Sequence, residues 1–108
     1  MIYFIQGENT RRIKIGFTTR FVHSRISALQ TGSPDKLIFL GARPGDEQIE
    51  YELHNKFRNY YSHGEWFYES NALNQYIKQY CFHDIAVAHS VDSLVAADIA
   101  SYETLLQL

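Results

Sequence analysis

The sequence has little of what an oxidising compartment or a membrane would require. Its single cysteine, Cys81, cannot form a disulfide within the chain, and disulfides are the usual mark of proteins from oxidising compartments. The apolar start MIYFIQ is too short for a signal peptide, and no apolar run approaches the length of a membrane span. We therefore expect a cytoplasmic protein with no membrane partner.

Internal repeats, linkers and low-complexity segments are also lacking. The chain has 108 residues, of which 45% are hydrophobic and 15% aromatic, a composition typical of a folded protein and not of a disordered one. A chain of this length fits one domain around one modest core. We expect a single domain over residues 1–108, with its core in about residues 1–70 and a helical extension in about residues 71–108.

The net charge is small, at −2, but it is unevenly distributed. Residues 1–43 contain seven Lys and Arg against two Asp and Glu, a net charge of +5, whereas residues 44–108 contain three against ten, a net charge of −7. This division permits one surface that faces phosphates and a separate surface for another purpose. The candidate phosphate contacts are four cations of the basic half, namely Arg11, Arg12, Arg20 and Lys36.

Two short alternating apolar runs, MIYFIQ and RRIKIGF, are separated by GENT, which is typical of a β-hairpin. Cross-strand partners share a face of the sheet. A two-residue turn at Glu8-Asn9 would therefore place Tyr3 directly opposite Lys14, with the tyrosine hydroxyl facing the surface. A phenol beside an ammonium group gives up its proton more easily, which makes Tyr3 a candidate base.

The hairpin is followed by a segment with helical periodicity. Thr18 or Thr19 can cap a helix that runs to about Gln30, and TGSP then ends it. The apolar stripe of this helix consists of Val22, Ile26 and Leu29. Because Arg25 lies on the flank of that stripe, we expect it to point along the sheet edge into a cleft.

A third strand and a second helix come next. KLIFLGAR, at residues 36–43, predicts the strand, and EQIEYELHNKFRNYY, at residues 47–61, predicts a helix with Asp46 as its N-cap. The apolar stripe of this helix consists of Ile49, Leu53, Phe57 and Tyr60. Glu50 and His54 lie one turn apart on the same flank of the stripe.

The rest of the chain is predicted to be mostly helical. SHGEWFYES is interpreted as a loop in which GEWF clamps the structure, with Trp66 and Phe67 in the core and Glu65 capping or pairing. A helix starting at Ser70 or Asn71 follows, then a short strand in DIAVAH. The pattern of residues about 90–108 predicts an amphipathic helix. We expect part of its apolar stripe to contact a second copy of the chain, which would make the protein a homodimer.

Tyr3, Lys14, Arg25 and Glu50 together suit phosphodiester chemistry. A carboxylate can hold a divalent cation, two cations can neutralise a pentacovalent phosphate, and a phenol can activate water. The alternative is that these residues belong to a surface hairpin and helix flanks with solvated charges.

The same residues resemble motifs of the GIY-YIG nuclease superfamily. The shared features are IYF on the first strand, KIG on the second, an arginine on the next helix and IE at the start of a later one. ALQTGSP and ELHNKF…GEWF resemble its small stand-alone phage and bacterial branch. The resemblance implies an α/β (α+β) fold with a small three-stranded antiparallel sheet flanked by helices. It also implies one divalent cation, Mg²⁺ or Mn²⁺, and hydrolysis of a nucleic-acid backbone in a bacterial or phage protein.

Carried over by position, the resemblance makes Tyr3 the base, Gly16 the turn glycine, Arg25 the phosphate contact and Glu50 the metal ligand. Lys14 replaces the second-motif tyrosine, a variation that this branch shares. His54 serves in proton transfer or phosphate contact, or is simply a packed or solvent-exposed histidine. We expect a metal-dependent endonuclease that cuts DNA. The alternatives are a nucleic-acid-binding module with weak or lost catalysis, and an interaction protein that acts through its acidic part.

Overall fold

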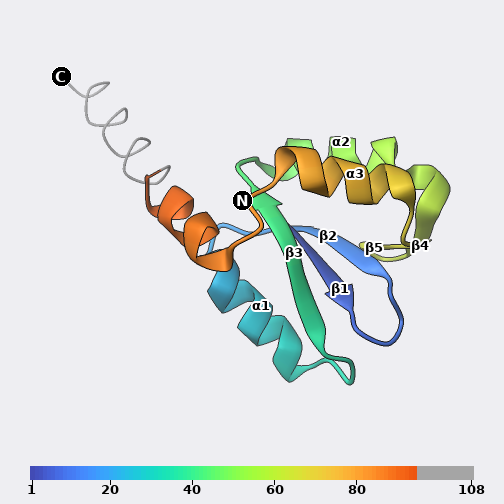
Figure 1. Cartoon of the computed structure of the whole chain (residues 1–108), viewed down its shortest axis with the longest axis horizontal. Helices are drawn as coiled ribbons and strands as arrows, with labels where there is room; N and C mark the ends of the chain where they lie inside the picture. The colour runs from blue at the N-terminus through green and yellow to red at the C-terminus, as the bar shows by residue number, and fades with distance from the viewer. Residues whose placement is uncertain (95–108) are drawn as a thin grey trace.

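A twisted antiparallel sheet with helices on both faces forms the framework of residues 1–94, the part of the chain that this computed structural model describes (Figure 1). Within these residues the sheet has five strands in the order β3-β1-β2-β5-β4. The strands are β1 (Ile2–Gly7), β2 (Ile13–Phe17), β3 (Leu37–Arg43), β4 (Tyr61–His63) and β5 (Trp66–Phe67). The helices are α1 (Val22–Thr31), α2 (Glu47–Lys56), the short 3₁₀ helix η1 (Arg58–Tyr60) and α3 (Asn71–Tyr80), and residues 85–94 are helical as well.

The expectation of three strands is wrong, because the segment interpreted as a loop forms a second hairpin. Gly64, at φ +54°, makes the tight turn between β4 and β5. The backbone of β5 then pairs with β2, where Ile13 faces Phe67 and Lys14 faces Trp66. This pairing satisfies backbone groups of β2 that would otherwise lie unpaired at an edge of the sheet.

The predicted register of the first hairpin is wrong by two residues. Tyr3 pairs with Gly16, and Lys14 pairs with Ile5. The connection is longer than a two-residue turn: the Gly7 amide donates to the Arg12 carbonyl, and Arg11 has a φ of 62°. Because a shift of two residues leaves each side chain on its own face, Tyr3 and Lys14 share a face but are not directly opposite each other.

Two apolar clusters cover the two faces of the sheet, as Figure 1 shows for the helices on either side. On one face, α2 and α3 pack against the strands, with Ile2, Phe4, Ile13, Ile15, Leu53, Phe57, Phe67, Leu73, Tyr76 and Ile77 as the buried residues. On the other face, α1 and residues 85–94 pack over Met1, Tyr3, Ile5, Val22, Ala42 and Ala88. The predicted apolar stripe of α1 is confirmed. The four stripe residues predicted for the helix at 47–61 also pack in the core, but α2 ends at Lys56, so Phe57 caps it and Tyr60 lies in η1. The core continues beyond residue 70 into α3.

The observed helix ends agree in part with those predicted from the sequence. Asp46 caps α2 and Ser70 caps α3 through side-chain oxygens that accept backbone amides, as predicted. The predicted cap of α1 is wrong: α1 starts at Val22, and Thr18 instead accepts the amide of Arg20 within the preceding turn.

The strand predicted in residues 84–89 is also wrong, because most of that segment belongs to the helical residues 85–94. The greater part of the helix predicted at about 90–108, with its intermolecular stripe, lies outside the described residues. Among residues 1–94, no helix combines the length and the apolar character that crossing a membrane requires.

Candidate functional site

Lys14 is held at the junction of the two hairpins by an ion pair with Glu65. Its pairing partner across the strands is Trp66, so the neighbouring Glu65 comes within reach, and Lys14 Nζ lies 2.8 Å from Glu65 Oε2. The lysine side chain is 13% exposed and that of Glu65 42% exposed. The cation therefore costs little to bury on an apolar strand, because a carboxylate from 51 positions further along compensates its charge.

Glu50, on the first turn of α2, belongs to the same group of charges. Its side chain is 20% exposed. Burial raises the pKa of Glu50, and the negative charge of Glu65 raises it further, whereas His54 and Lys14 act in the opposite direction. The charges of both Lys14 and Glu65 thus act on the pKa of the Glu50 carboxyl. We name Lys14, Glu50, His54 and Glu65 the carboxylate cluster.

His54 fastens α2 to the edge of β2. Its Nε2 lies 2.9 Å from the carbonyl oxygen of Ile15 and 3.9 Å from Glu50 Oε1. A carbonyl only accepts hydrogen bonds, so Nε2 carries the hydrogen, and in the neutral ring Nδ1 is left as an acceptor. The ring also packs edge-on against Phe67. His54 therefore has a positioning role and a nitrogen that can still take a proton.

Tyr3 and Gly16 form one close-fitting unit beside this cluster. Tyr3 is 1% exposed, so the expectation of a surface-facing hydroxyl is wrong. Gly16 lies within β2 and not in a turn, which corrects its predicted role. A Cβ at position 16 would overlap the Tyr3 ring and hydroxyl, so the glycine makes room for the tyrosine. The hydroxyl thus lies over Gly16, the residue next to Ile15, whose carbonyl binds His54.

Arg25 lies on α1, on the face of the sheet that holds Tyr3. It is half-buried and forms no ion pair with a described residue. The charges that shift the pKa of Glu50 come from Glu65, His54, Lys14 and Glu47, and Arg25 is not among them. The structure thus brings together Lys14, Glu50 and His54, with Tyr3 bordering them, and leaves Arg25 on the flanking helix.

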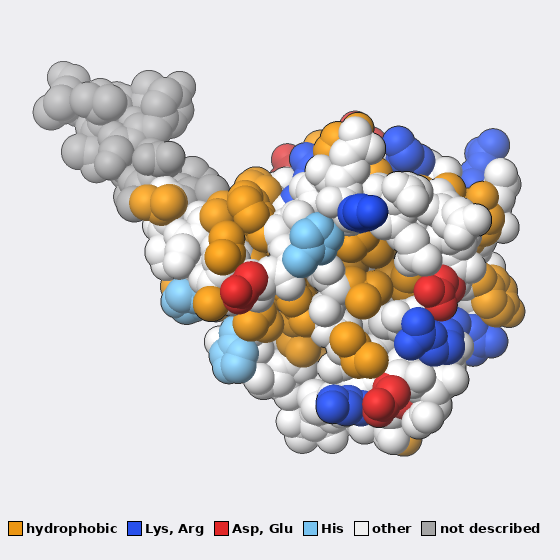
Figure 2. Space-filling view, in the orientation of Figure 1, with side chains coloured by type: hydrophobic (Ala, Val, Ile, Leu, Met, Phe, Trp, Pro, Cys, Tyr) orange, Lys and Arg blue, Asp and Glu red, His pale blue; other side chains and the backbone are white. Residues whose placement is uncertain are grey.

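The four predicted phosphate contacts do not form one patch. Arg11, Arg12 and Lys36 lie at the end of the sheet where β1 turns into β2, whereas Arg20 follows the opposite end of β2. Arg11 Nε lies 3.5 Å from Glu69 Oε2. On the face of the molecule displayed in Figure 2, the Lys and Arg side chains are scattered, and several of them lie beside Asp or Glu. The phosphate-facing surface that the charge division permits is not purely basic, because Glu65 and Glu69 of the second half pair with Lys14 and Arg11 of the first.

The cluster offers two carboxylates to a cation. Among residues 1–94, no three His, Cys, Asp or Glu side chains gather into a metal-binding group. Glu50 and Glu65 are close enough for one charge to raise the pKa of the other carboxyl, and a divalent cation would relieve that repulsion. Mg²⁺ commonly binds through one or two protein carboxylates together with substrate phosphates, so Glu50 and Glu65 are the donor type that such an ion takes.

Glu65 is the member of the cluster that the sequence identified only loosely, as a residue that caps or pairs. The interpretation of GEWF as a clamp is otherwise confirmed: Phe67 is buried and Trp66 packs partly buried against the core. The sequence signal for this hairpin is Gly64 followed closely by the aromatic residues Trp66, Phe67 and Tyr68, since glycine favours a tight turn and aromatic residues favour strands.

Comparison with known proteins connects this arrangement with a family. The model of the T5orf172 domain matches residues 1–83, a stretch that contains the whole carboxylate cluster and runs from β1 to the end of α3. The comparison found no matching curated protein and no matching solved structure.

Proposed function

Because the chain belongs to the T5orf172 domain family, which is associated with phage nuclease-type proteins, we propose that it is a metal-dependent endonuclease of the GIY-YIG type that hydrolyses phosphodiester bonds of DNA. The observation that carries the proposal is the carboxylate cluster. A half-buried glutamate with a raised pKa, a second glutamate, a lysine and a histidine meet at the edge of β2, next to the Tyr3–Gly16 unit. Perturbed acidic groups beside cations are characteristic of sites that handle charged substrates.

Glu50 and Glu65 would hold one Mg²⁺ or Mn²⁺. The bound cation supplies Lewis-acid polarisation of a phosphoryl oxygen. A cation held by Glu65 would compete with Lys14 for that carboxylate, and the Lys14 ammonium, which lies 2.8 Å from Glu65 Oε2, would then face the negative charge that develops on the phosphate. Arg25, on the flanking helix, is the second cation assigned to the phosphate.

The hydrolysis needs a group that takes a proton from the attacking water. The water oxygen forms a bond to phosphorus while the bond from phosphorus to the leaving oxygen breaks, and the proton of the water passes to a base. We assign this role to Tyr3, whose oxygen lies over Gly16 and accepts the proton as the phenolate, while the leaving oxygen takes its proton from solvent. His54 Nδ1 is the rival acceptor, since its Nε2 hydrogen is engaged by the Ile15 carbonyl.

The second candidate is a nucleic-acid-binding module with weak or lost catalysis. The burial of Tyr3 favours it, because a tyrosine that is 1% exposed offers very little surface to a substrate. The compensation of Lys14 by Glu65 favours it as well, since the lysine is engaged in the absence of a cation.

Incubation with nucleic acid tests the proposal and separates it from this rival. The purified protein is mixed with double-stranded DNA, single-stranded DNA and RNA, with Mg²⁺, Mn²⁺ or a chelator, and fragments are resolved on a denaturing gel. We expect cleavage of DNA that the chelator abolishes. Tyr3→Phe is expected to abolish it too, whereas His54→Gln retains some activity; the reverse order would make His54 the base.

Glu50→Gln and Glu52→Gln form a matched pair on α2. Glu50 belongs to the cluster, whereas Glu52 is exposed on the same helix. We expect Glu50→Gln to remove cleavage and the stabilisation of the fold by Mn²⁺, measured as a shift in melting temperature. Glu52→Gln should retain both. Binding without cleavage in every metal would leave only the binding module, and equal activity of the two variants would exclude Glu50 as the ligand.

A further inference from the structure

A groove lined by Trp66 adjoins the carboxylate cluster and shares Lys14 with it, whereas its other lining residues have no part in the chemistry proposed above. Two adjoining cavities, of about 210 and 260 Å³, share Ser33, Pro34, Leu37 and Trp66 in their linings. They are therefore parts of one groove, which we name the tryptophan groove. One end reaches Arg12 and His63, and the other reaches Lys14.

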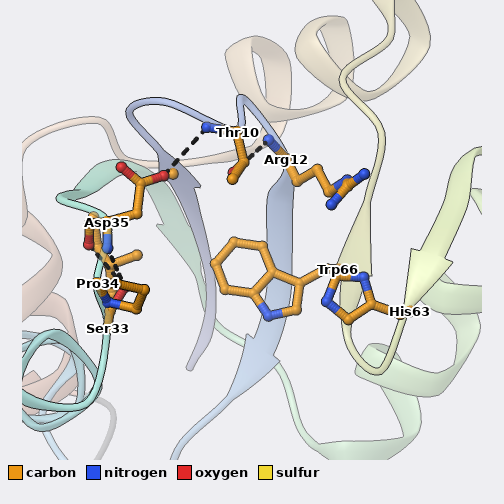
Figure 3. Close-up of a pocket in the computed structure, with 9 residues that line it drawn as sticks. Thr10, Arg12, Ser33, Pro34, Asp35, His63 and Trp66 are labelled. Carbon is orange, nitrogen blue, oxygen red and sulfur yellow. Dashed lines mark hydrogen bonds between the residues drawn. The ribbon is translucent and has the colours of Figure 1, made fainter.

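The walls of the groove are flat and largely apolar. Figure 3 shows the indole of Trp66 between the Ser33–Pro34 segment on one side and Arg12 with His63 on the other. Ile5, Leu29 and Leu37 complete the lining near Lys14. Figure 3 shows the indole face-on, with Pro34 beyond its edge, and an aromatic face of this kind suits a planar aromatic ligand that can stack on it.

A cation stands at each end of this apolar stretch. The Arg12 guanidinium lies 5.0 Å from the centre of the Tyr68 ring and forms no ion pair with a residue that the structure describes. At the other end, the Lys14 ammonium lies 5.9 Å from the centre of the Trp66 ring and 2.8 Å from Glu65 Oε2, so a phosphate there would share the ammonium with that carboxylate. An aromatic surface between two cations matches a nucleotide strand, in which flat bases alternate with phosphates.

Two polar groups of the lining, the Asp35 carboxylate and the Ser33 hydroxyl, are already engaged within the protein. The Asp35 carboxylate accepts the backbone amides of Asn9 and Thr10 and the side-chain amide of Asn9. The Ser33 hydroxyl donates to the Asp35 carbonyl. Few donors and acceptors are therefore left to read the edge of a base, so recognition by stacking alone is expected to tolerate any sequence.

We propose that the tryptophan groove binds one unpaired nucleotide of the nucleic-acid strand, with its base stacked on Trp66 and its flanking phosphates at Arg12 and Lys14. A base inside a duplex is stacked on both sides and cannot enter such a groove unless it is unpaired or flipped out. The inference rests on the proposed function and gives it a substrate class: a single-stranded or unpaired stretch next to the phosphate handled at Lys14.

The intrinsic fluorescence of the protein tests this directly, because Trp66 is the only tryptophan in the chain. The titration is made in chelator, so that no cleavage occurs. The probes are a short oligothymidylate, an abasic strand with the same number of phosphates, a duplex and thymidine monophosphate. We expect the oligothymidylate to quench the emission and to bind roughly 5- to 150-fold more tightly than the abasic strand, which is the range for stacking of one base.

Variants check the same point by anisotropy of a labelled oligothymidylate. Trp66→Phe keeps an aromatic face and should lose less affinity than Trp66→Leu. Tyr80→Ala is the matched control, since Tyr80 is an exposed aromatic residue on α3, which covers the other face of the sheet. Melting curves identify a variant that fails to fold, and the fluorescence of the unaltered protein does not depend on any variant.

The outcomes separate this proposal from the proposed function. Equal binding of the abasic strand and the oligothymidylate, without quenching, would overturn the groove proposal and leave the nuclease proposal standing. Quenching by the monophosphate but not by the strand would assign the groove to free nucleotides and overturn it as well. The absence of binding to any nucleic acid at any salt concentration would remove the proposed function itself.

Discussion

At the scale of single residues, Tyr3 occupies the space that Gly16 leaves above β2. Any side chain at position 16 would overlap the tyrosine ring, and Tyr3 in turn fills part of the core beneath α1. The pair therefore links strand packing with the position of the hydroxyl. The stability of the sheet and the geometry of the site depend on the same contact.

Gly16→Ala should destabilise the fold by about 1–3 kcal/mol, because the new methyl group forces the Tyr3 ring out of its position. Urea denaturation measures the change. Gly32→Ala is the matched control: it also adds one methyl group, but nothing lies within 4 Å of it and its backbone φ is −94°. If the two variants lost equal stability, the contact with Tyr3 would not be the cause.

The ionisation of Glu50 gives a pH-dependent prediction. Burial and the charge of Glu65 raise its pKa above the ordinary value of 4.5, so the folded state holds the proton more tightly than the unfolded state does. Stability from this group is thus present at low pH and is lost as the pH rises through the folded pKa. In chelator at pH 7, Glu50→Gln should therefore raise the melting temperature, because it removes the charge that burial disfavours.

The same comparison at pH 3.5 provides the contrast. Glu50 is protonated there in both states, so the glutamine should bring little or no gain. A melting temperature that rises equally at both pH values would mean that the glutamine acts through packing and not through the charge.

At the scale of elements, the β4–β5 hairpin decides which residues meet at the site. Its strands have three and two residues, too few for an alternating pattern to distinguish them from a loop. The longer elements β1, β2, β3, α1, α2 and α3 were predictable, because each carries a full apolar stripe or alternation. For β1 and β2, the sequence predicted which residues share a face of the sheet but not which residues are paired. The turn between them is longer than predicted because Arg11 adopts a left-handed backbone conformation, and no glycine marks this position in the sequence.

The candidate site was also predictable only in part: the sequence identified residues of the site but not the contacts between distant segments. Motif positions identified Tyr3, Lys14 and Glu50, but the Lys14–Glu65 contact depends on β5 lying beside β2. The burial of Tyr3 depends on α1 covering that face of the sheet. Neither follows from local sequence, because both are set by tertiary packing of distant segments.

Substitutions at Gly64 test the geometry of the turn between β4 and β5. Its φ of +54° is strained for most residues, yet nothing lies within 4 Å of a Cβ at this position. Gly64→Ala should therefore cost about 1–2 kcal/mol through backbone strain alone, and Gly64→Asn should cost less, because asparagine tolerates this conformation. Urea denaturation of the two variants measures the difference. Equal losses would show that the turn does not hold Gly64 in a left-handed conformation.

At the scale of the whole molecule, charge is distributed in a way that the sequence halves do not reveal. Glu65 and Glu69 fold back onto Lys14 and Arg11. The pair of Arg11 with Glu69 is long and its side chains are 56% and 36% exposed, so it contributes little and releases Arg11 readily to a phosphate. Arg11, Arg12 and Lys36 then form the cationic end of the molecule that adjoins the tryptophan groove.

The salt dependence of single-strand binding should reflect these three cations. Each phosphate contact contributes about −0.7 to the slope of log affinity against log salt concentration, so we expect a slope of roughly −2 from the three contacts. Fluorescence anisotropy of a labelled strand in chelator, over a range of salt concentrations, measures it.

Arg12→Gln should reduce the magnitude of the slope by about 0.7. Lys78→Gln removes an equal charge from α3, on the other face of the sheet, and should leave the slope unchanged. If instead Lys78→Gln flattened the slope and Arg12→Gln did not, the strand would bind over α3, and the hairpin end would not be the cationic surface that receives it.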